Sequence, residues 1–169
     1  NQSKDDNGST ALYIASEFNH PEVVRLLLSK SDIDINKVAN DGATALYVAS
    51  CTNHVEVVRL LLSKSDIDIN KAKDGGATAL FVASYEGHVE VVRLLLSKSE
   101  IDINRVAKDG RTALYTASYE GHVEVVRLLL SKSDIDINKA QKNGATSLYV
   151  ASYNGHLEVV RLLLSKSDI

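Results

Sequence analysis

The chain has 169 residues, of which 44% are apolar, with a formal net charge of −3 and a pI near 5.9. This length fits one ordinary domain. A nucleic-acid reader needs a basic face and a membrane-surface protein a basic amphipathic helix, and this mildly acidic balance favours neither. No apolar run approaches the roughly 18 residues of a spanning helix. We therefore expect neither nucleic-acid binding nor membrane insertion.

Cysteine usage and the start of the chain bear on its compartment. Cys51 is the only cysteine, so an internal disulfide is excluded and no metal-type cysteine spacing exists. The first residue is Asn rather than Met, and no charged, then apolar, then small-residue pattern of a signal peptide follows. These features predict an intracellular, cytoplasmic protein and a piece cut from a longer chain.

The sequence repeats itself with a fixed period. The histidines lie 34 residues apart, at His20, His54, His88, His122 and His156. A glycine keeps the same step, at Gly8, Gly42, Gly76, Gly110 and Gly144. We therefore predict a single repeat array over 1–169, with a lead-in at 1–7 and units at 8–41, 42–75, 76–109, 110–143 and 144–169, the last truncated.

Each unit begins with a turn and a short apolar segment, as at 40–50. The Thr44 hydroxyl can accept a hydrogen bond from a free N–H of a following helical turn. Leu46 and Ala49, three residues apart, then lie on one side of that helix. The pattern predicts a short first helix capped by Thr44.

A helix-to-helix turn and a second helix come next. The turn holds Asn53 and His54, and later copies have glycine in place of the asparagine, a residue that adopts a left-handed conformation at low cost. Segment 55–63 is apolar nearly all round, and its polar Glu56, Arg59 and Ser63 fall along one narrow stripe. We expect a second helix that is mostly buried.

The unit ends at 66–70, where polar and apolar residues alternate strictly, which predicts a brief extended stretch. A unit of helix, turn, helix and extended arm cannot bury its own apolar face, so neighbouring units must stack. The expected fold is an all-α solenoid of stacked helix-turn-helix units with short hairpin-like loops.

A 34-residue period also occurs in tetratricopeptide repeats, but their Trp and closing Pro are absent. Instead, the runs Thr-Ala-Leu-Tyr-x-Ala-Ser and Gly-His-Val-Glu-Val-Val-Arg-Leu-Leu-Leu resemble the ankyrin repeat, whose signature is Thr-Pro-Leu-His-x-Ala-Ala followed by Gly-His-x-Glu-Val-Val-x-Leu-Leu-Leu. The resemblance covers essentially the whole chain and implies an ankyrin-repeat solenoid. The unit here is one residue longer than is usual in that family.

One departure from this signature is at the His of its first half, where this chain has tyrosine or phenylalanine in every copy. These residues are Tyr13, Tyr47, Phe81, Tyr115 and Tyr149. Because Phe81 has no hydroxyl, a hydrogen bond from this position is not obligatory, and we expect a packing role.

The sequence offers little for catalysis, metal or cofactor binding. Stacked units place the histidines about 10 Å apart, too far for one metal ion. His54 and Glu56 match half of a zinc deaminase motif, but Pro-Cys-x-x-Cys is absent. There is no Gly-x-Ser-x-Gly elbow, and the glycine turn at 74–78 lacks the Lys of a phosphate loop. We expect no enzyme activity, no metal and no cofactor.

Differences among the copies concentrate at the turn tips and at two positions late in the first helix. The resemblance implies that these positions line a concave surface that binds partner proteins. The tips change from acidic to basic along the chain. The candidate partner-binding residues are Asp6, Asn7, Glu17, Phe18, Asn40, Asp41, Cys51, Thr52, Asp74, Tyr85, Glu86, Lys108, Asp109, Arg111, Tyr119, Glu120, Lys142, Asn143, Tyr153 and Asn154.

Within this set Tyr85, Tyr119 and Tyr153 form an aromatic row, and tyrosine is favoured in binding hot spots. The sequence leaves open whether these rings bind a partner or pack on neighbouring repeats. The function that we infer is a non-catalytic protein-protein interaction scaffold with a protein partner of unknown identity. The alternative is a structural spacer or elastic repeat segment of a larger multidomain protein.

Two further expectations concern the end of the array and its asparagines. Terminal repeats usually carry polar outer faces, yet the last copy keeps Val160, Leu162, Leu163 and Leu164, which predicts weak self-association through an uncapped C-terminal face. The resemblance also implies that one asparagine in each complete copy stands where ankyrin repeats can be hydroxylated. These are Asn36, Asn70, Asn104 and Asn138.

Overall fold

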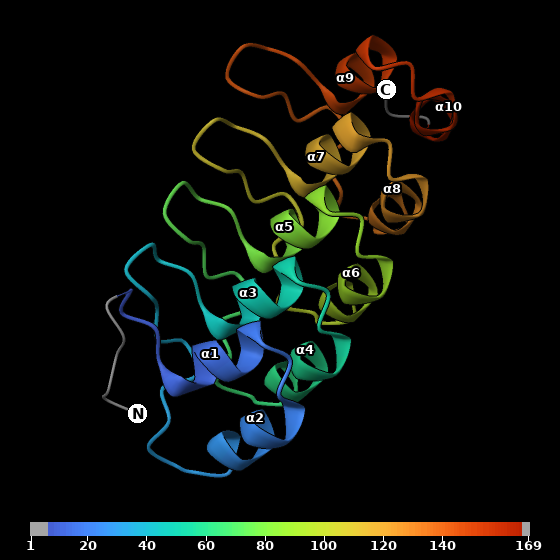
Figure 1. Cartoon of the computed structure of the whole chain (residues 1–169). Coiled ribbons are helices and arrows are strands. Elements are labelled where there is room, and N and C mark those ends of the chain that lie inside the picture. The colour runs from blue at the N-terminus through green and yellow to red at the C-terminus, as the bar shows by residue number, and fades with distance from the viewer. Residues whose placement is uncertain (1–6, 167–169) are drawn as a thin grey trace.

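A computed structural model describes residues 7–166, and within them the chain forms ten helices and no strand. In chain order they are α1 (Ala11–Glu17), α2 (Pro21–Leu28), α3 (Ala45–Cys51), α4 (Val55–Leu62), α5 (Ala79–Tyr85), α6 (Val89–Leu96), α7 (Ala113–Glu120), α8 (Val123–Leu130), α9 (Ser147–Tyr153) and α10 (Leu157–Leu164). The odd-numbered helices form one layer and the even-numbered helices a second, with long loops projecting to one side (Figure 1). The predicted all-α solenoid is confirmed.

The first helix of each pair is capped as expected. The Thr44 hydroxyl oxygen accepts a hydrogen bond from the backbone N–H of Tyr47 at 3.1 Å. The other first helices have the same cap, formed by Thr10, Thr78, Thr112 and Thr146. Each cap satisfies one of the N–H groups that a helix start leaves without a partner.

The turn between the two helices of a pair depends on a left-handed residue. Gly87 has a φ of 74°, and Asn53 takes the same place in the second pair with a φ of 59°. The turn closes when the His88 N–H donates to the Ala83 carbonyl at 2.9 Å. The predicted tight turn is therefore present, and it sets the two helices of a pair side by side.

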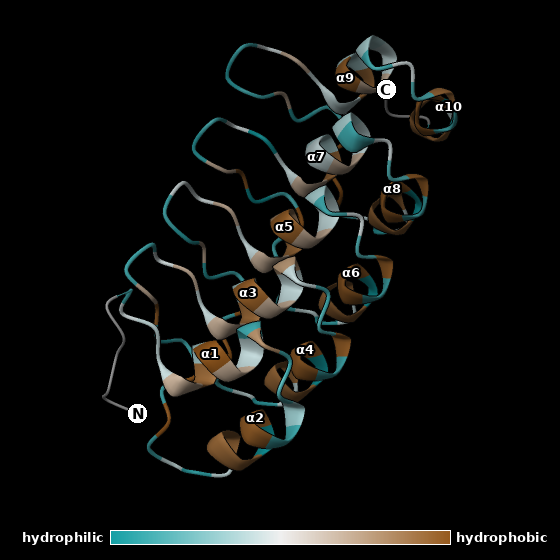
Figure 2. Ribbon diagram, viewed as in Figure 1, coloured by the Kyte–Doolittle hydropathy of each residue, from teal (hydrophilic) through white to brown (hydrophobic). Residues whose placement is uncertain are grey.

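The second helices of the three middle pairs, α4, α6 and α8, bury most of their apolar side chains, as predicted, whereas α2 and α10 at the ends of the array keep exposed apolar residues. In α4, Val57, Val58 and Leu61 are fully buried, while Glu56 and Arg59 remain exposed. Each second helix packs on the second helices of neighbouring pairs, and each first helix on neighbouring first helices, so that one apolar core runs through the array. Figure 2 shows the apolar residues on the helices and mainly polar residues in the projecting loops.

The predicted extended stretch at 66–70 is wrong. The chain turns twice here, because the Ile67 N–H donates to Lys64 at 3.4 Å and the Lys71 N–H to Asp68 at 3.2 Å. The polar and apolar residues still differ in burial, since Ile69 lies in the core while Asp66 and Asp68 are exposed. The backbone groups are satisfied by turns and by a neighbouring asparagine side chain, which removes the need for a strand partner.

Candidate functional site

The loops that project from the helices are hairpins. In the hairpin between α2 and α3, the Ala39 N–H donates to the Ala43 carbonyl at 2.9 Å, and the Gly42 N–H donates to Ala39 at 3.0 Å. The Asp41 carboxylate accepts the Ala43 N–H at 3.0 Å. Gly42 has a φ of 79°, a conformation that few other residues adopt without strain. These bonds fix the shape of the tip.

Neighbouring hairpins are joined to one another by backbone hydrogen bonds. The bonds run from Asn40 to Asn7 (2.9 Å), Asp74 to Asp41 (2.9 Å), Lys108 to Gly75 (2.8 Å) and Lys142 to Asp109 (3.1 Å), with the N–H donor named first. The tips therefore form one continuous row rather than independent loops.

A second set of bonds fixes the carboxyl ends of the first helices. Each histidine at the start of α4, α6, α8 and α10 places Nε2 against a carbonyl oxygen of the preceding pair. The pairs are His54 with Glu17 (2.9 Å), His88 with Cys51 (2.9 Å), His122 with Tyr85 (2.8 Å) and His156 with Tyr119 (2.8 Å). Because a carbonyl oxygen only accepts, Nε2 carries the proton in each bond.

The predicted aromatic row is exposed. The exposed fractions are 39% for Tyr85, 45% for Tyr119 and 79% for Tyr153, and Phe18 in the first pair is also exposed. Among the other late first-helix residues, Thr52, Glu86 and Asn154 are exposed and Glu17, Cys51 and Glu120 are half-buried. The Asn154 amide donates to the Tyr119 carbonyl at 2.9 Å.

The predicted tip residues also lie at the surface. Exposed ones are Asn7, Asn40, Asp41, Asp74, Lys108, Asp109, Lys142 and Asn143. Arg111 is half-buried, and its guanidinium donates a hydrogen bond to the Asp109 carboxylate at 2.6 Å. Asp6 lies outside the described residues.

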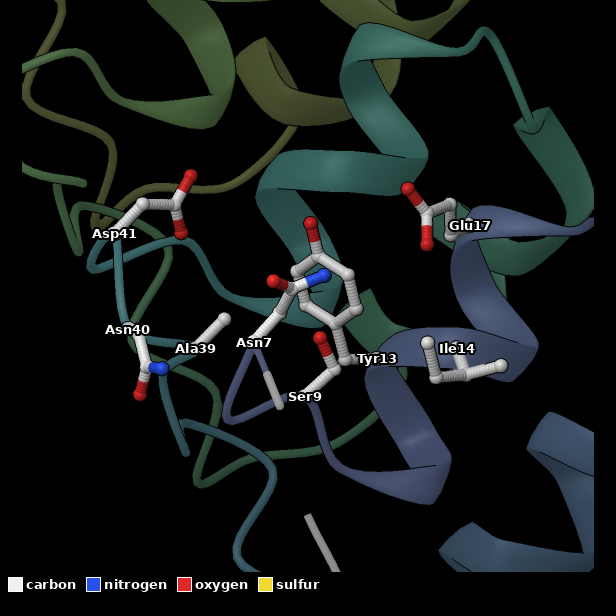
Figure 3. A pocket seen from close by; sticks show the side chains of 8 residues that line it. All are labelled: Asn7, Ser9, Tyr13, Ile14, Glu17, Ala39, Asn40 and Asp41. Atoms are coloured by element: carbon white, nitrogen blue, oxygen red, sulfur yellow. The ribbon is translucent and has the colours of Figure 1, made fainter. Parts of the chain in front are cut away.

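At the N-terminal end of the array, a hairpin tip and the end of a first helix lie close together. Asp41 at a tip and Glu17 at the end of α1 line the same hollow, as Figure 3 shows. We use the name hairpin face for the surface made by the hairpin tips and by the last residues of the first helices. The candidate residues within 7–166 all belong to these two sets.

Sequence reasoning missed the contacts of the signature-position aromatics. The Lys73 ammonium lies 5.2 Å from the centre of the Tyr47 ring, and the Arg111 guanidinium lies 5.7 Å from that of Phe81. These rings thus do more than pack, since a cation above an aromatic face is attracted by its negative charge density.

In the last two helix pairs, the aromatic residue at this position makes other contacts. The Gln141 amide donates to the Tyr115 hydroxyl at 2.6 Å, and Tyr115 is buried. Tyr149 is exposed and stacks on Tyr153, with ring centres 6.5 Å apart. The expected packing role therefore fits Tyr115 but not Tyr149.

Hydrogen bonds, charges and burial shift the pKa of several groups on or beside the hairpin face. A hydrogen bond from Lys73, at 2.9 Å, holds the pKa of the Asp41 carboxyl below its usual value. Burial raises the pKa of Tyr47 to about 12. Burial, with help from the charge of Glu86, also raises the pKa of the Cys51 thiol, which leaves it less reactive than a free thiol.

Two further features concern metal binding and membrane spanning in the described part of the chain. No three His, Cys, Asp or Glu side chains between residues 7 and 166 lie close enough together to hold a metal ion. Over the same residues, no helix is both long and apolar enough to cross a bilayer.

Helix pairs stacked in two layers, with hairpins joined tip to tip, define a repeat solenoid. A family model described as ankyrin repeats, three copies long, matches residues 1–73, 33–107, 66–141 and 100–169. The chain belongs to the ankyrin repeat family. Ankyrin repeats are protein-protein interaction modules and are typically non-enzymatic. None of the curated proteins compared with the chain matches it.

Proposed function

We propose that this protein is a non-catalytic intracellular scaffold that binds a partner protein through the hairpin face. The observation that carries the proposal is the exposure of Tyr85, Tyr119 and Tyr153 along that face. A tyrosine ring presents a large contact area with a polar end and loses little conformational entropy on binding. Residues of this kind dominate the binding energy of many interfaces.

The position of these rings also supports binding. The carbonyl groups of Tyr85 and Tyr119 are bonded by His122 and His156 at 2.8 Å, which fixes the helix ends that carry the rings. A surface that is already ordered loses less entropy when a partner docks. The five units proposed from the sequence would act as one array, and the tip charges, which differ from unit to unit, would set which partner fits.

A pull-down from lysate of the source cells tests the proposal, with captured proteins identified by mass spectrometry. The bait is the 169-residue chain, compared with a variant carrying Tyr85→Ala, Tyr119→Ala and Tyr153→Ala. The matched control carries Arg59→Ala, Arg93→Ala and Arg127→Ala, which remove three exposed side chains from second helices. Circular dichroism verifies that all three proteins are folded.

We expect one or more proteins to be retained by the wild type and by the arginine control and lost by the tyrosine variant. Truncation of a true anchor costs about 2 kcal/mol or more of binding free energy. Equal retention by all three baits would place the contact away from the tyrosines. If no bait retains a protein, the spacer or elastic segment becomes the better interpretation.

A second proposal is weak self-association through the C-terminal end of the array. Leu157 and Leu164 on α10 are each more than half exposed. Of the residues expected there from sequence, Leu163 is instead fully buried in the apolar core, and Val160 and Leu162 are half-buried. We therefore assign the exposed end face to Leu157 and Leu164.

A further inference from the structure

Each of the four hairpins that connect one helix pair to the next is closed by two residues that face one another across its turn. These pairs are Ala39 with Ala43, Lys73 with Ala77, Ala107 with Arg111, and Gln141 with Ala145. In the last three pairs, one member is an alanine and the other is a long polar side chain. That side chain always reaches back to the aromatic ring of the preceding helix pair.

The ring at the equivalent position of each pair can thus be covered by a side chain from either arm of the hairpin. Lys73 precedes its turn and covers Tyr47, whereas Arg111 follows its turn and covers Phe81. Both covering groups are cations, and each also binds a tip carboxylate, Lys73 at 2.9 Å and Arg111 at 2.6 Å. In two helix pairs, therefore, the space above such a ring is occupied by a cation that is also paired with a carboxylate.

The hairpin between α2 and α3 lacks this covering side chain, because both of its closing residues, Ala39 and Ala43, are alanines. No cation within residues 7–166 lies over the Tyr13 ring. A hollow of about 270 Å³ is found in its place, lined by Tyr13, Ile14 and Ala39 and by the carboxylate-bearing Glu17 and Asp41. Figure 3 shows the ring between these two acidic residues.

The electrostatics of the hollow favour a positive charge. Burial raises the pKa of the Tyr13 hydroxyl, and the charges of Glu17 and Asp41 raise it further, while Lys73 opposes them. Lys73 already binds the Asp41 carboxylate. The Glu17 carboxylate forms no salt bridge with any residue between 7 and 166. One negative charge beside an aromatic ring is therefore left to attract a cation.

We propose that this hollow binds a lysine or arginine side chain of the partner protein, at the N-terminal end of the hairpin face. The inference rests on the proposed function and adds the chemistry of one contact. The incoming cation takes the position over Tyr13 that Lys73 takes over Tyr47, and it pairs with Glu17. The volume is below the roughly 300–1,000 Å³ of pockets for drug-sized molecules, which favours a single side chain.

A titration of the isotope-labelled chain with small probes, followed by amide NMR shifts, tests the site without the partner. The probes are N-acetyl-lysine N-methylamide, the arginine equivalent and the neutral norleucine equivalent. We expect saturable shifts confined to residues 7–17 and 39–43 with both cations. The affinity for norleucine should be about two- to fivefold lower, which corresponds to an exposed cation-π contact.

Two matched variants make the test specific. Ala39→Lys supplies the covering side chain that Lys73 supplies one hairpin later, and it should abolish the titration. Ala107→Lys places the same residue in the equivalent position of a hairpin whose Phe81 is already covered. Ala39 and Ala107 are each 8% exposed, so burial opposes the two substitutions to the same extent. The Ala107→Lys variant should titrate like the wild type.

Equal shifts with lysine and norleucine probes, or an unchanged titration of folded Ala39→Lys, would overturn the cation site. Once a partner is captured in the pull-down, Ala39→Lys should weaken its retention and Ala107→Lys should not. Retention of the partner by Ala39→Lys at the wild-type level would overturn the assignment of the hollow to the partner. That result would leave the tyrosine-dependent scaffold untouched, so the two proposals fail separately.

Discussion

The imidazole Nε2 of His88 lies 2.9 Å from the backbone carbonyl oxygen of Cys51, which belongs to the preceding helix pair. The bond connects the start of one second helix to the end of the previous first helix. Three other histidines make the same contact. These bonds cross the boundaries between helix pairs, so their loss should weaken the stacking of the array rather than a single helix.

His122→Ala removes the bond to the Tyr85 carbonyl and should lower the free energy of unfolding by about 1–2 kcal/mol, the range for a lost hydrogen bond. Urea denaturation measures this change. His20→Ala is the control, because His20 starts α2 and no helix pair precedes its own within residues 7–166. An equal loss for both variants would show that the histidines act only within their own turns.

Asn70 makes two bonds across the next boundary. Its amide donates to the Glu100 carbonyl at 2.7 Å and its oxygen accepts the Asp102 N–H at 2.8 Å. Asn70→Ala should therefore lower the free energy of unfolding, measured by urea denaturation, by about 1–2 kcal/mol. Asn143→Ala removes an acceptor that serves only its own hairpin, through the Ala145 N–H at 3.0 Å, and should cost less.

Hydroxylation of the equivalent asparagines, which the family resemblance implies, stays a prediction. An intact mass of the protein from its native cells tests it. An unmodified mass would contradict it.

Gly87→Ala should destabilise the array for two separate reasons. Gly87 has a φ of 74°, which costs an L-residue about 1–2 kcal/mol, and an added Cβ would lie 2.7 Å from the His122 ring. Gly155→Ala has only the first cost, because its φ is 73° and no atom lies within 4 Å of the added Cβ. The denaturation midpoint should fall further for Gly87→Ala. Equal midpoints would show that the His122 ring moves aside without cost.

The elements that sequence predicted best are those set by local backbone rules. The Thr44 cap and the left-handed Gly87 turn depend only on residues within a few positions of each other. The arm at 66–70 was predicted wrongly because its alternation suits a strand or a pair of turns equally. The choice is made by the side chain of Asn36, from the preceding unit, which bonds the backbone of Asp66 and Asp68.

The contacts above the aromatic rings were harder to predict. Lys73 and Arg111 stand at different positions of their hairpins and cover rings of other helix pairs. A position-by-position comparison of the copies therefore records them as unrelated substitutions. Only the hairpin pairing, in which Lys73 faces Ala77 and Ala107 faces Arg111, shows that Lys73 and Arg111 cover equivalent rings.

Stability should also respond to alkaline pH through Tyr47. Its pKa is about 12 in the folded chain, against an ordinary value of 10.0. The Tyr47 hydroxyl ionises at a lower pH in the unfolded chain than in the folded chain. Its contribution to the free energy of unfolding is therefore fully present below pH about 10 and is lost as the pH rises to about 12. Urea denaturation across this range should show a smaller loss for Tyr47→Phe than for the wild type. Tyr149→Phe, at an exposed ring, is the control, and equal losses in all three proteins would contradict the prediction.

Self-association through the C-terminal end should depend on Leu157 and Leu164. Sedimentation velocity should show an average mass that rises with concentration for the 169-residue chain. Leu157→Glu with Leu164→Glu should remove the rise, because buried apolar area drives such contacts. The control is Leu26→Glu at the opposite end of the array, also an exposed leucine. A concentration-independent monomer in the wild type would refute the proposal.

The bonds between tips, the histidine bonds and the asparagine bonds all recur at successive boundaries with equivalent donors and acceptors. A gene duplication or deletion that adds or removes one whole unit would therefore rejoin surfaces that already fit. Each new boundary would inherit a complete set of hydrogen bonds without a compensating mutation. Length is thus a property that evolution can change in this protein in a single step, while the hairpin face gains or loses one tip at a time.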